Sequence, residues 1–477
     1  MKLSNIIQAE YAMKQFNYFK LKITKTKKSY IRRGKKMEML NKWTHGLKKG
    51  IIGSLLAPMF LVNGNVVFAE TAPEMDAKAA MAIDFESGKV LYNQNGDTQL
   101  GIASMTKMLV EYILFETIEA GDISWDDMVE VSEYAYDVSQ NYFLSNVPLR
   151  EGGMYSIHEL YEALAIYSAN GATIAIAEAI AGSEPAFVDM MIEKVDSWGI
   201  ADYHLVNTTG LNNESLNGNI YPGSNETDEN SMTARGVAKV ATQLLKEYPE
   251  VLETSSIPEK VFREGTSDAI TMKNWNWMLP GLIYERENVD GLKTGTTDYA
   301  GASITGTAVE NDRRMVTVVM GAGDGETNKA QRFQVTDQLL TYGYGNWDTF
   351  DVVAEAEAIE SIEAFDVSSG KAESVRIAAG SSQEIMAPTG ANEEDFIFEF
   401  SPNEDLLDED GALIAPIEKG AEIGELLVRY EGDDLGYLDE TEGQVISAIA
   451  AEGVEKANVF SLAMTWVKSF FGGLFNK

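Results

Sequence analysis

The sequence has no cysteine among its 477 residues and only three histidines, His45, His158 and His204. The absence of cysteine excludes disulfides, a cysteine nucleophile, cysteine-ligated metal and a lipid anchor on cysteine. His158 opens His-Glu-Leu-Tyr-Glu, which lacks the second histidine of a zinc-protease helix. Neither His158 nor His204 stands in a setting typical of a Ser-His-Asp triad. We therefore expect no metal and no cofactor, and chemistry that does without histidine.

The first apolar run, Ile51 to Val62, is too short to span a membrane comfortably. Basic residues 42–50 precede it, and Val67-Phe68-Ala69 follows with small residues at cleavage-site positions, which is the order of a secretory signal peptide. We expect residues 1–69 to be a leader and signal peptide, with translation starting at Met1, Met37 or Met39. An uncleaved N-terminal anchor is the alternative interpretation. Either way the pattern predicts an exported protein.

Basic residues are scarce after that leader. Residues 1–69 hold 14 Lys or Arg and 2 Asp or Glu, which leaves 24 basic against 72 acidic residues and a net charge of −48 for the rest. Nucleic acid phosphates would repel such a chain, so we expect no nucleic-acid partner.

Residues 70–347 mix predicted helices and strands. Residues 79–92 predict two short strands around a Glu86-Ser87-Gly88 turn, and residues 302–310 and 313–322 predict a strand pair joined by Asn311-Asp312. Apolar residues at helical spacing predict helices over 104–120, 157–182 (broken at 168–171), 231–253 with Ser231 as N-cap, and 331–342. Helices packed on an antiparallel sheet form one α+β domain.

The remainder has a different texture. Short alternating segments separated by Gly, Pro, Asn and Asp predict a small all-β domain over 348–452. Residues 453–477 are rich in aromatic and aliphatic side chains with a narrow polar stripe, and they predict an amphipathic helix lying in a membrane surface. Trp466, Phe470, Phe471 and Phe475 would insert at the lipid interface. The alternative is a core helix of the β domain.

Three short motifs carry the candidate chemistry. Ser104-Met-Thr-Lys107 opens a predicted helix, and a lysine one turn after a serine faces the same side and can accept its proton. That lysine must be neutral, so it needs burial or a neighbouring cation to lower its pKa. Ser168-Ala-Asn170 lies at a helix break, where its hydroxyl can relay a proton and its amide can orient substrate.

The third motif, Lys293-Thr294-Gly295, leads into the predicted strand pair. Its lysine adds positive potential, its threonine can bind a carboxylate, and its glycine lets an extended substrate lie along the strand. Similar short matches occur elsewhere, as at Ser368-Ser-Gly-Lys371, and a single match is weak. The three chosen motifs fall in one domain, 64 and 125 residues apart, in the setting that each chemistry requires.

With the segments YSANGA, NTTGL (207–211), SMTAR (231–235) and VDGLKTGTTDYAG (289–301), these motifs resemble the low-molecular-weight penicillin-binding proteins, the D-alanyl-D-alanine carboxypeptidases of peptidase family S11. The resemblance covers essentially all of 75–477. It implies the serine penicillin-binding/β-lactamase-like transpeptidase fold and removal of the terminal D-alanine from peptidoglycan pentapeptide stems through an acyl-enzyme. It also implies covalent inhibition by β-lactam antibiotics and a location at the outer face of the cytoplasmic membrane or cell wall.

The resemblance also implies roles for single residues. Ser104 is the expected nucleophile and Lys107 its base, and Ser168 and Asn170 are the expected proton-relay and orienting pair. Lys293 is expected to supply positive potential and Thr294 to bind the substrate carboxylate. The backbone N–H groups of Ser104 and Thr296 would form the oxyanion hole. Arg235 is expected to help bind the carboxylate, with a structural ion pair as the alternative. Many relatives have His or Tyr at the position of Thr296, so the side-chain contribution to deacylation is open.

Three other activities fit the same motifs. A class A β-lactamase would need a Glu-x-x-Leu-Asn loop, which residues 70–477 lack. A D,D-endopeptidase acting on cross-links would use the same site. A penicillin sensor would only be acylated, without turning over.

Overall fold

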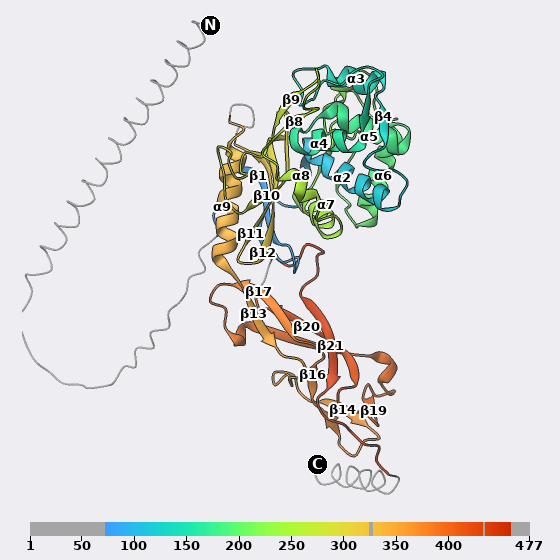
Figure 1. Ribbon diagram of the computed structural model, residues 1–477. Coiled ribbons are helices and arrows are strands. Elements are labelled where there is room, and N and C mark those ends of the chain that lie inside the picture. The colour runs from blue at the N-terminus through green and yellow to red at the C-terminus, as the bar shows by residue number, and fades with distance from the viewer. Residues whose placement is uncertain (1–71, 324–327, 433–434, 459–477) are drawn as a thin grey trace, which may run out of the picture. The chain divides into compact units, whose positions relative to one another are not determined.

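The computed structural model describes residues 72–323, 328–432 and 435–458 (Figure 1). The predicted signal peptide and the aromatic part of the predicted terminal helix lie outside these ranges, so both stay predictions. The described residues from 72 onward belong to one compact unit. None of the helices within the described ranges is long and apolar enough to cross a bilayer.

A five-stranded antiparallel sheet in the order β10-β11-β12-β1-β2 supports the site. Its strands are β1 (Ala77–Asp84), β2 (Val90–Gln94), β10 (Val289–Thr297), β11 (Gly301–Glu310) and β12 (Arg313–Ala322). Both predicted hairpins are confirmed, and the turn residues Asn311 and Asp312 have the positive φ angles, 52° and 62°, that a tight hairpin turn requires. β10 stands at the edge of the sheet, so one side of this strand is left for other partners.

Alternation along β1 explains why both faces of the sheet are covered. Met81 and Ile83 point into the core of the helical layer, whereas Ala80 and Ala82 point into a second core beneath α9 (Gln331–Asn346). Figure 1 shows α9 on one side of the sheet and the other helices on the opposite side. Those helices are α2 (Lys107–Glu119), α3 (Glu133–Ser139), α4 (Ile157–Tyr167), α5 (Asn170–Ala181), α6 (Glu184–Ser197), α7 (Ala234–Glu247) and α8 (Val251–Ser255).

The helix predicted over 231–253 needs correction. Ser231 does not cap a helix: it lies in strand β7 (Ser231–Met232) between β3 (Leu100–Gly101) and β6 (Tyr203–His204). Thr233 caps α7 instead, because its hydroxyl accepts from Gly236 N. The predicted helix over 231–253 therefore begins later and breaks before α8. The remaining short strands of this region pair as β4 (Met128–Glu130) with β5 (Met154–Ser156) and β8 (Glu259–Phe262) with β9 (Ile270–Lys273).

The strand-rich prediction after residue 347 is confirmed. These strands enclose their own apolar core, which includes Val375, Ile377 and Leu426. They are β13 (Trp347–Val353), β14 (Phe365–Ser368), β15 (Ser374–Val375), β16 (Ile377–Ala379), β17 (Gln383–Pro388), β18 (Phe396–Pro402), β19 (Leu413–Ile414), β20 (Glu422–Tyr430) and β21 (Gln444–Ala450).

The start of the predicted terminal helix is wrong. Val454 forms an antiparallel bridge with Ile417, and Lys456 forms one with Gly370. Val454 is 2% exposed, so this stretch belongs to the β core. Residues 453–457 are therefore extended chain packed in the β region, and only residues beyond 458 remain available for an anchor.

Candidate active site

Ser104 lies in a short 3-10 helix, η1 (Ala103–Thr106), that leads directly into α2. The turn is tightly enclosed. A Cβ on Gly210 would lie 1.8 Å from Ala103 O, and one on Gly295 would lie 2.7 Å from Ile102 O. Gly295 of the third motif must therefore be a glycine, because β10 passes too close to the turn that carries Ser104 for a side chain to fit. The sequence did not reveal this reason.

Lys107 is completely buried, and its amine touches three oxygen atoms. Nζ lies 2.9 Å from Ser104 Oγ, 2.8 Å from Asn170 Oδ1 and 2.7 Å from Thr209 O. The last two oxygens are pure acceptors, so they account for the two N–H bonds of a neutral amine. The lone pair of that amine is then left for the hydroxyl of Ser104, which is the arrangement of a general base with its nucleophile.

Two physical effects favour the neutral form of this amine. Burial lowers the pKa of Lys107 well below its usual value, and the nearby positive charge of Lys293 lowers it further. Glu111, one helical turn later on α2, opposes both effects. The sequence predicted that the base would need burial or a neighbouring cation, and the structure supplies both.

The second and third motifs meet through Ser168 and Lys293. Ser168 ends α4 in the left-handed conformation, φ 58°, which turns the chain so that Asn170 can begin α5. Lys293 Nζ donates to Ser168 Oγ at 2.9 Å. Burial lowers the pKa of Lys293 to about 8, while the negative charge of Glu111 acts against that shift. The hydroxyl of Ser168 is therefore within reach of a proton donor.

A cleft of about 320 Å³ brings the predicted residues together. Its walls include six of them: Ser104, Ser168, Asn170, Thr294, Gly295 and Thr296. Lys107 and Lys293 are not among the lining residues, but each is hydrogen-bonded to one of them, Lys107 to Ser104 and Lys293 to Ser168. Because β10 is an edge strand, Thr294 and Thr296 line this cleft from the rim of the sheet.

Arg235 does not belong to this cleft. Its Nε donates to Asp97 Oδ1 at 2.6 Å, and the side chain lines a different hollow that includes Arg429. The expectation that Arg235 helps to bind a carboxylate is therefore wrong, and its contacts match the alternative, a structural ion pair.

The arginine that lines the cleft is Arg332 of α9, and not Arg235 as predicted. Its Nη1 donates to Gly295 O and to Thr296 Oγ1, both at 2.8 Å, and the residue lines the cleft. Burial lowers the pKa of Arg332 to about 10, and its Nε has no hydrogen-bond partner among the described residues. In the sequence, Arg332 was visible only as the single arginine of the helix predicted over 331–342, and it lies 36 residues after Thr296.

Glu111 is a second residue that sequence reasoning missed. It is 1% exposed, and burial raises its pKa to about 7, whereas Lys293 and Lys107 act to lower it. Four buried ionisable groups therefore meet at the site, the basic Lys107, Lys293 and Arg332 and the acidic Glu111, and the charge of one influences the protonation of its neighbours.

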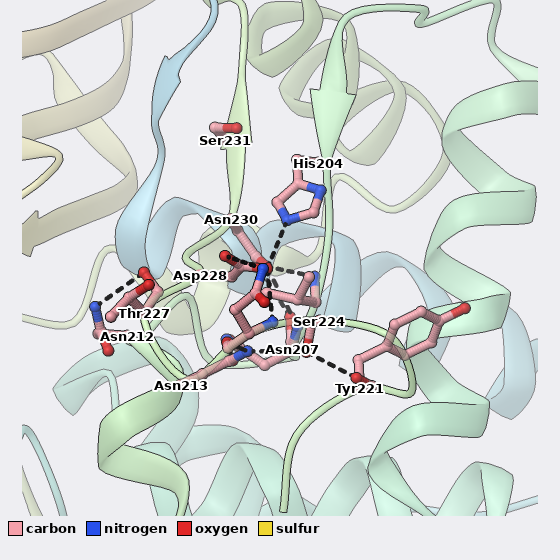
Figure 2. A network of polar contacts seen from close by, with 12 residues as sticks. His204, Asn207, Asn212, Asn213, Tyr221, Ser224, Thr227, Asp228, Asn230 and Ser231 are labelled. Atoms are coloured by element: carbon pink, nitrogen blue, oxygen red, sulfur yellow. Dashed lines mark hydrogen bonds and ion pairs between the residues drawn. The ribbon is translucent and has the colours of Figure 1, made fainter.

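A buried asparagine network orders the residues around the Thr209 carbonyl, and Figure 2 shows its two members, Asn207 and Asn230. Asn207 Oδ1 accepts from Gly210 N at 2.7 Å and from both the amide and the hydroxyl of Thr209. Asn230 Nδ2 donates to Asn207 O at 2.7 Å and to Thr106 Oγ1 at 3.0 Å. This network, which we call the asparagine bracket (Asn207 and Asn230), thus connects the loop that binds Lys107 to the turn that carries Ser104.

The described residues contain no group of three or more His, Asp or Glu side chains arranged to hold a metal ion. The chemistry of the cleft is that of a serine, two lysines and their hydrogen-bonding partners.

Comparisons with known proteins agree with this geometry. Residues 66–324 match the family described as D-alanyl-D-alanine carboxypeptidase, Peptidase S11. The chain is 29% identical over 360 residues to D-alanyl-D-alanine carboxypeptidase DacF of Bacillus subtilis, covering 76% of this chain and 83% of the relative.

Solved structures give the same answer. A peptidoglycan synthesis regulatory factor from Streptococcus pneumoniae superposes with a TM-score of 0.63 at 36% identity, covering 80% of this chain and all of that one. Penicillin-binding protein 5 of Haemophilus influenzae superposes with a TM-score of 0.60 at 25% identity, covering 81% of this chain and 99% of that one. The resemblance seen in the motifs is confirmed: the chain belongs to the D-alanyl-D-alanine carboxypeptidases of peptidase family S11, the low-molecular-weight penicillin-binding proteins.

Proposed function

We propose that this carboxypeptidase removes the terminal D-alanine of peptidoglycan pentapeptide stems through an acyl-enzyme on Ser104. The observation that carries the proposal is the triple contact of Lys107 Nζ. Two of its contacts are acceptors, so the remaining position of a neutral amine faces Ser104 Oγ at 2.9 Å. As Ser104 attacks the carbonyl carbon of the scissile bond, its proton passes to Lys107.

The leaving D-alanine needs a proton on its amine. Ser168 Oγ can deliver one, because Lys293 Nζ lies 2.9 Å behind it as a proton source. Cleavage releases D-alanine and leaves the shortened stem as an ester on Ser104. Lys107 gives the serine proton up to solvent, and Lys293 regains from solvent the proton that it donated, so both lysines return to their starting states. The neutral Lys107 then takes a proton from a water molecule as that water attacks the ester, and it passes this proton to Ser104 Oγ as the stem is released.

Substrate orientation follows from the charges in the cleft. The C-terminal carboxylate lies toward Thr294, Thr296 and the buried guanidinium of Arg332, while Lys293 adds positive potential. The backbone N–H groups of Ser104 and Thr296 face the carbonyl oxygen and stabilise the negative charge that develops on it. β-Lactams carry a carboxylate beside a reactive amide, so they enter the same cleft as covalent inhibitors.

The protein acts at the outer face of the cytoplasmic membrane or in the cell wall. The sequence of 1–69 supports export, and the aromatic segment after residue 458 supports peripheral attachment to the membrane. The described β region ends where that segment begins, which keeps the anchor apart in sequence from the cleft.

The proposal is tested by labelling the mature protein with a fluorescent penicillin and mapping the labelled peptide by mass spectrometry. We expect the label on Ser104 and a slow loss of label as water completes the turnover. Label on Ser168 would overturn the assignment of the nucleophile. Label that never leaves Ser104 would indicate a sensor instead of a carboxypeptidase.

A further inference from the structure

Two aromatic side chains stand almost fully exposed at the mouth of the cleft. Tyr142 is 84% exposed and Phe143 is 81% exposed, and their ring centroids lie 4.2 Å apart. Both residues line the cleft that contains Ser104. Exposing large apolar rings to water is unfavourable in free energy unless another molecule covers them. Exposed apolar side chains at a binding cleft therefore indicate a surface that contacts the ligand.

The loop that carries the two rings is fixed to the catalytic residues. Ser145 O accepts from both Asn170 N and Asn170 Nδ2 at 3.0 Å. Asn146 Oδ1 accepts from Gly171 N at 2.9 Å, and its Nδ2 donates to Val138 O at 2.8 Å. The same Asn170 binds Lys107 through its Oδ1. The loop that carries Tyr142 and Phe143 is therefore tied at Ser145 and Asn146 to the helix start that binds Lys107.

Aromatic and cationic side chains reach the cleft from different elements. Tyr167 and Trp275 also line it, with stacked rings 6.0 Å apart, and Trp275 Nε1 donates to Tyr167 O. Lys329 and Arg332 line the cleft as well, and Arg332 is bonded to Thr296 of β10, whereas the loop of Tyr142 and Phe143 is bonded to Asn170 of α5. A substrate that places its carboxylate beside the cations at β10 extends the part preceding its scissile bond past Ser104, toward the α5 side to which the loop of these rings is bonded.

We propose that Tyr142 and Phe143 form an acyl-side subsite that binds uncharged, apolar groups preceding the scissile bond. The inference rests on the proposed function, because it names the kind of acyl group that the same cleft prefers. Bulky N-acylated peptides and β-lactams with aromatic acyl substituents are the favoured class. Small acyl groups reach Ser104 equally well but leave both rings in solvent, so they gain nothing from the subsite.

The test compares two penicillins that differ only in the acyl group, one with phenylacetyl and one with acetyl. Acylation rate constants are measured for the mature protein, for the double variant Tyr142→Ser/Phe143→Ser and for Ile283→Ser. Ile283 is 80% exposed and lies outside the cleft, so its substitution controls for removal of an exposed apolar side chain.

We expect the unaltered protein to react about tenfold faster with the phenylacetyl compound, the double variant to lose most of this preference, and Ile283→Ser to keep it. Reaction with the acetyl compound should be the same in the unaltered protein and in Ile283→Ser. An equal preference in the double variant, or no preference in the unaltered protein, overturns the subsite while the acylation itself still supports the proposed function. Absence of acylation by either compound overturns both proposals.

Discussion

Lys107 is the residue on which the proposed chemistry depends most directly. Lys107→Arg preserves a long cationic side chain and its helix propensity, but arginine does not give up its proton at ordinary pH. We expect acylation by penicillin to fall by at least about 100-fold, the lower range of what a general base contributes.

The matched control is Lys260→Arg, because Lys260 likewise bonds to a side chain of the helical layer, the carboxylate of Glu162, but lies outside the cleft. Stopped-flow labelling measures both variants. Near-normal acylation by Lys107→Arg would mean that Lys107 is a structural cation.

The pH profile of acylation depends on three buried groups. Lys107 must be neutral, which favours higher pH, whereas Lys293, with a pKa of about 8, must keep its proton. The rate constant should therefore decline as the pH rises through about 8. Glu111 raises the pKa of both lysines, so Glu111→Gln should lower both values and move the alkaline decline to lower pH. Rate measurements between pH 6 and 10 (a range of about two units either side of that pKa) check the direction, and an unchanged or higher midpoint would contradict it.

Sequence reasoning found the residues that stand in short motifs and missed those that act through space. Ser104, Lys107, Ser168, Asn170, Lys293 and Thr294 occur in local patterns whose chemistry can be named in advance. Arg332 reaches the cleft from the far side of the sheet, and its contacts with Gly295 and Thr296 depend on tertiary packing. Arg235 shows the opposite failure, because a suggestive neighbourhood in sequence did not bring it to the cleft.

The asparagine bracket makes a prediction at the level of elements. Asn207→Ala removes the acceptor that orders residues 209 and 210, so the Thr209 carbonyl loses its fixed place beside Lys107. We expect acylation to slow by roughly 10-fold or more, because a displaced acceptor leaves the amine free to turn its lone pair away from Ser104.

Asn274→Ala is its control. Asn274 is also a buried asparagine that orders a loop, with Nδ2 donating to Ser255 O and Ile257 O, but it lies outside the cleft. Both variants should lose stability by about 1–3 kcal/mol through unsatisfied buried groups, which thermal melting measures. Equal effects of the two substitutions on acylation would show that the bracket serves stability alone.

Element boundaries were less predictable than element types. The helix predicted from 231 begins after Thr233, because residues 231–232 complete a small sheet whose other strands lie far away in sequence. Residues 453–457 pair with Ile417 and Gly370 for the same reason. Periodicity records which face of a segment is apolar, but it does not record which distant strand has an open edge.

At the scale of the whole molecule, the anchor should be separable from the enzyme. Truncation after residue 458 keeps every described pairing of the β region, and we expect the shortened protein to leave the membrane with unchanged activity on small soluble peptides. High salt should not release the full-length protein, because the acidic chain is repelled by anionic lipid and its attachment would depend on aromatic insertion.

Sedimentation with vesicles measures release. Truncation after residue 452 is the contrasting variant: it removes the buried Val454 and should also lower the melting temperature. Continued sedimentation of the form ending at 458, or release of the intact protein by salt alone, would contradict the proposed anchor.

The most direct test of the central claim uses a muropeptide with a pentapeptide stem. The mature protein and its Ser104→Ala variant are each incubated with it, and the products are weighed by mass spectrometry. The variant should stay folded, because loss of one hydroxyl at a helix start costs about 1 kcal/mol. We predict that the unaltered protein releases one D-alanine per stem and that the variant releases none. An untouched stem with the unaltered protein, or equal release by both proteins, would contradict a carboxypeptidase that works through Ser104.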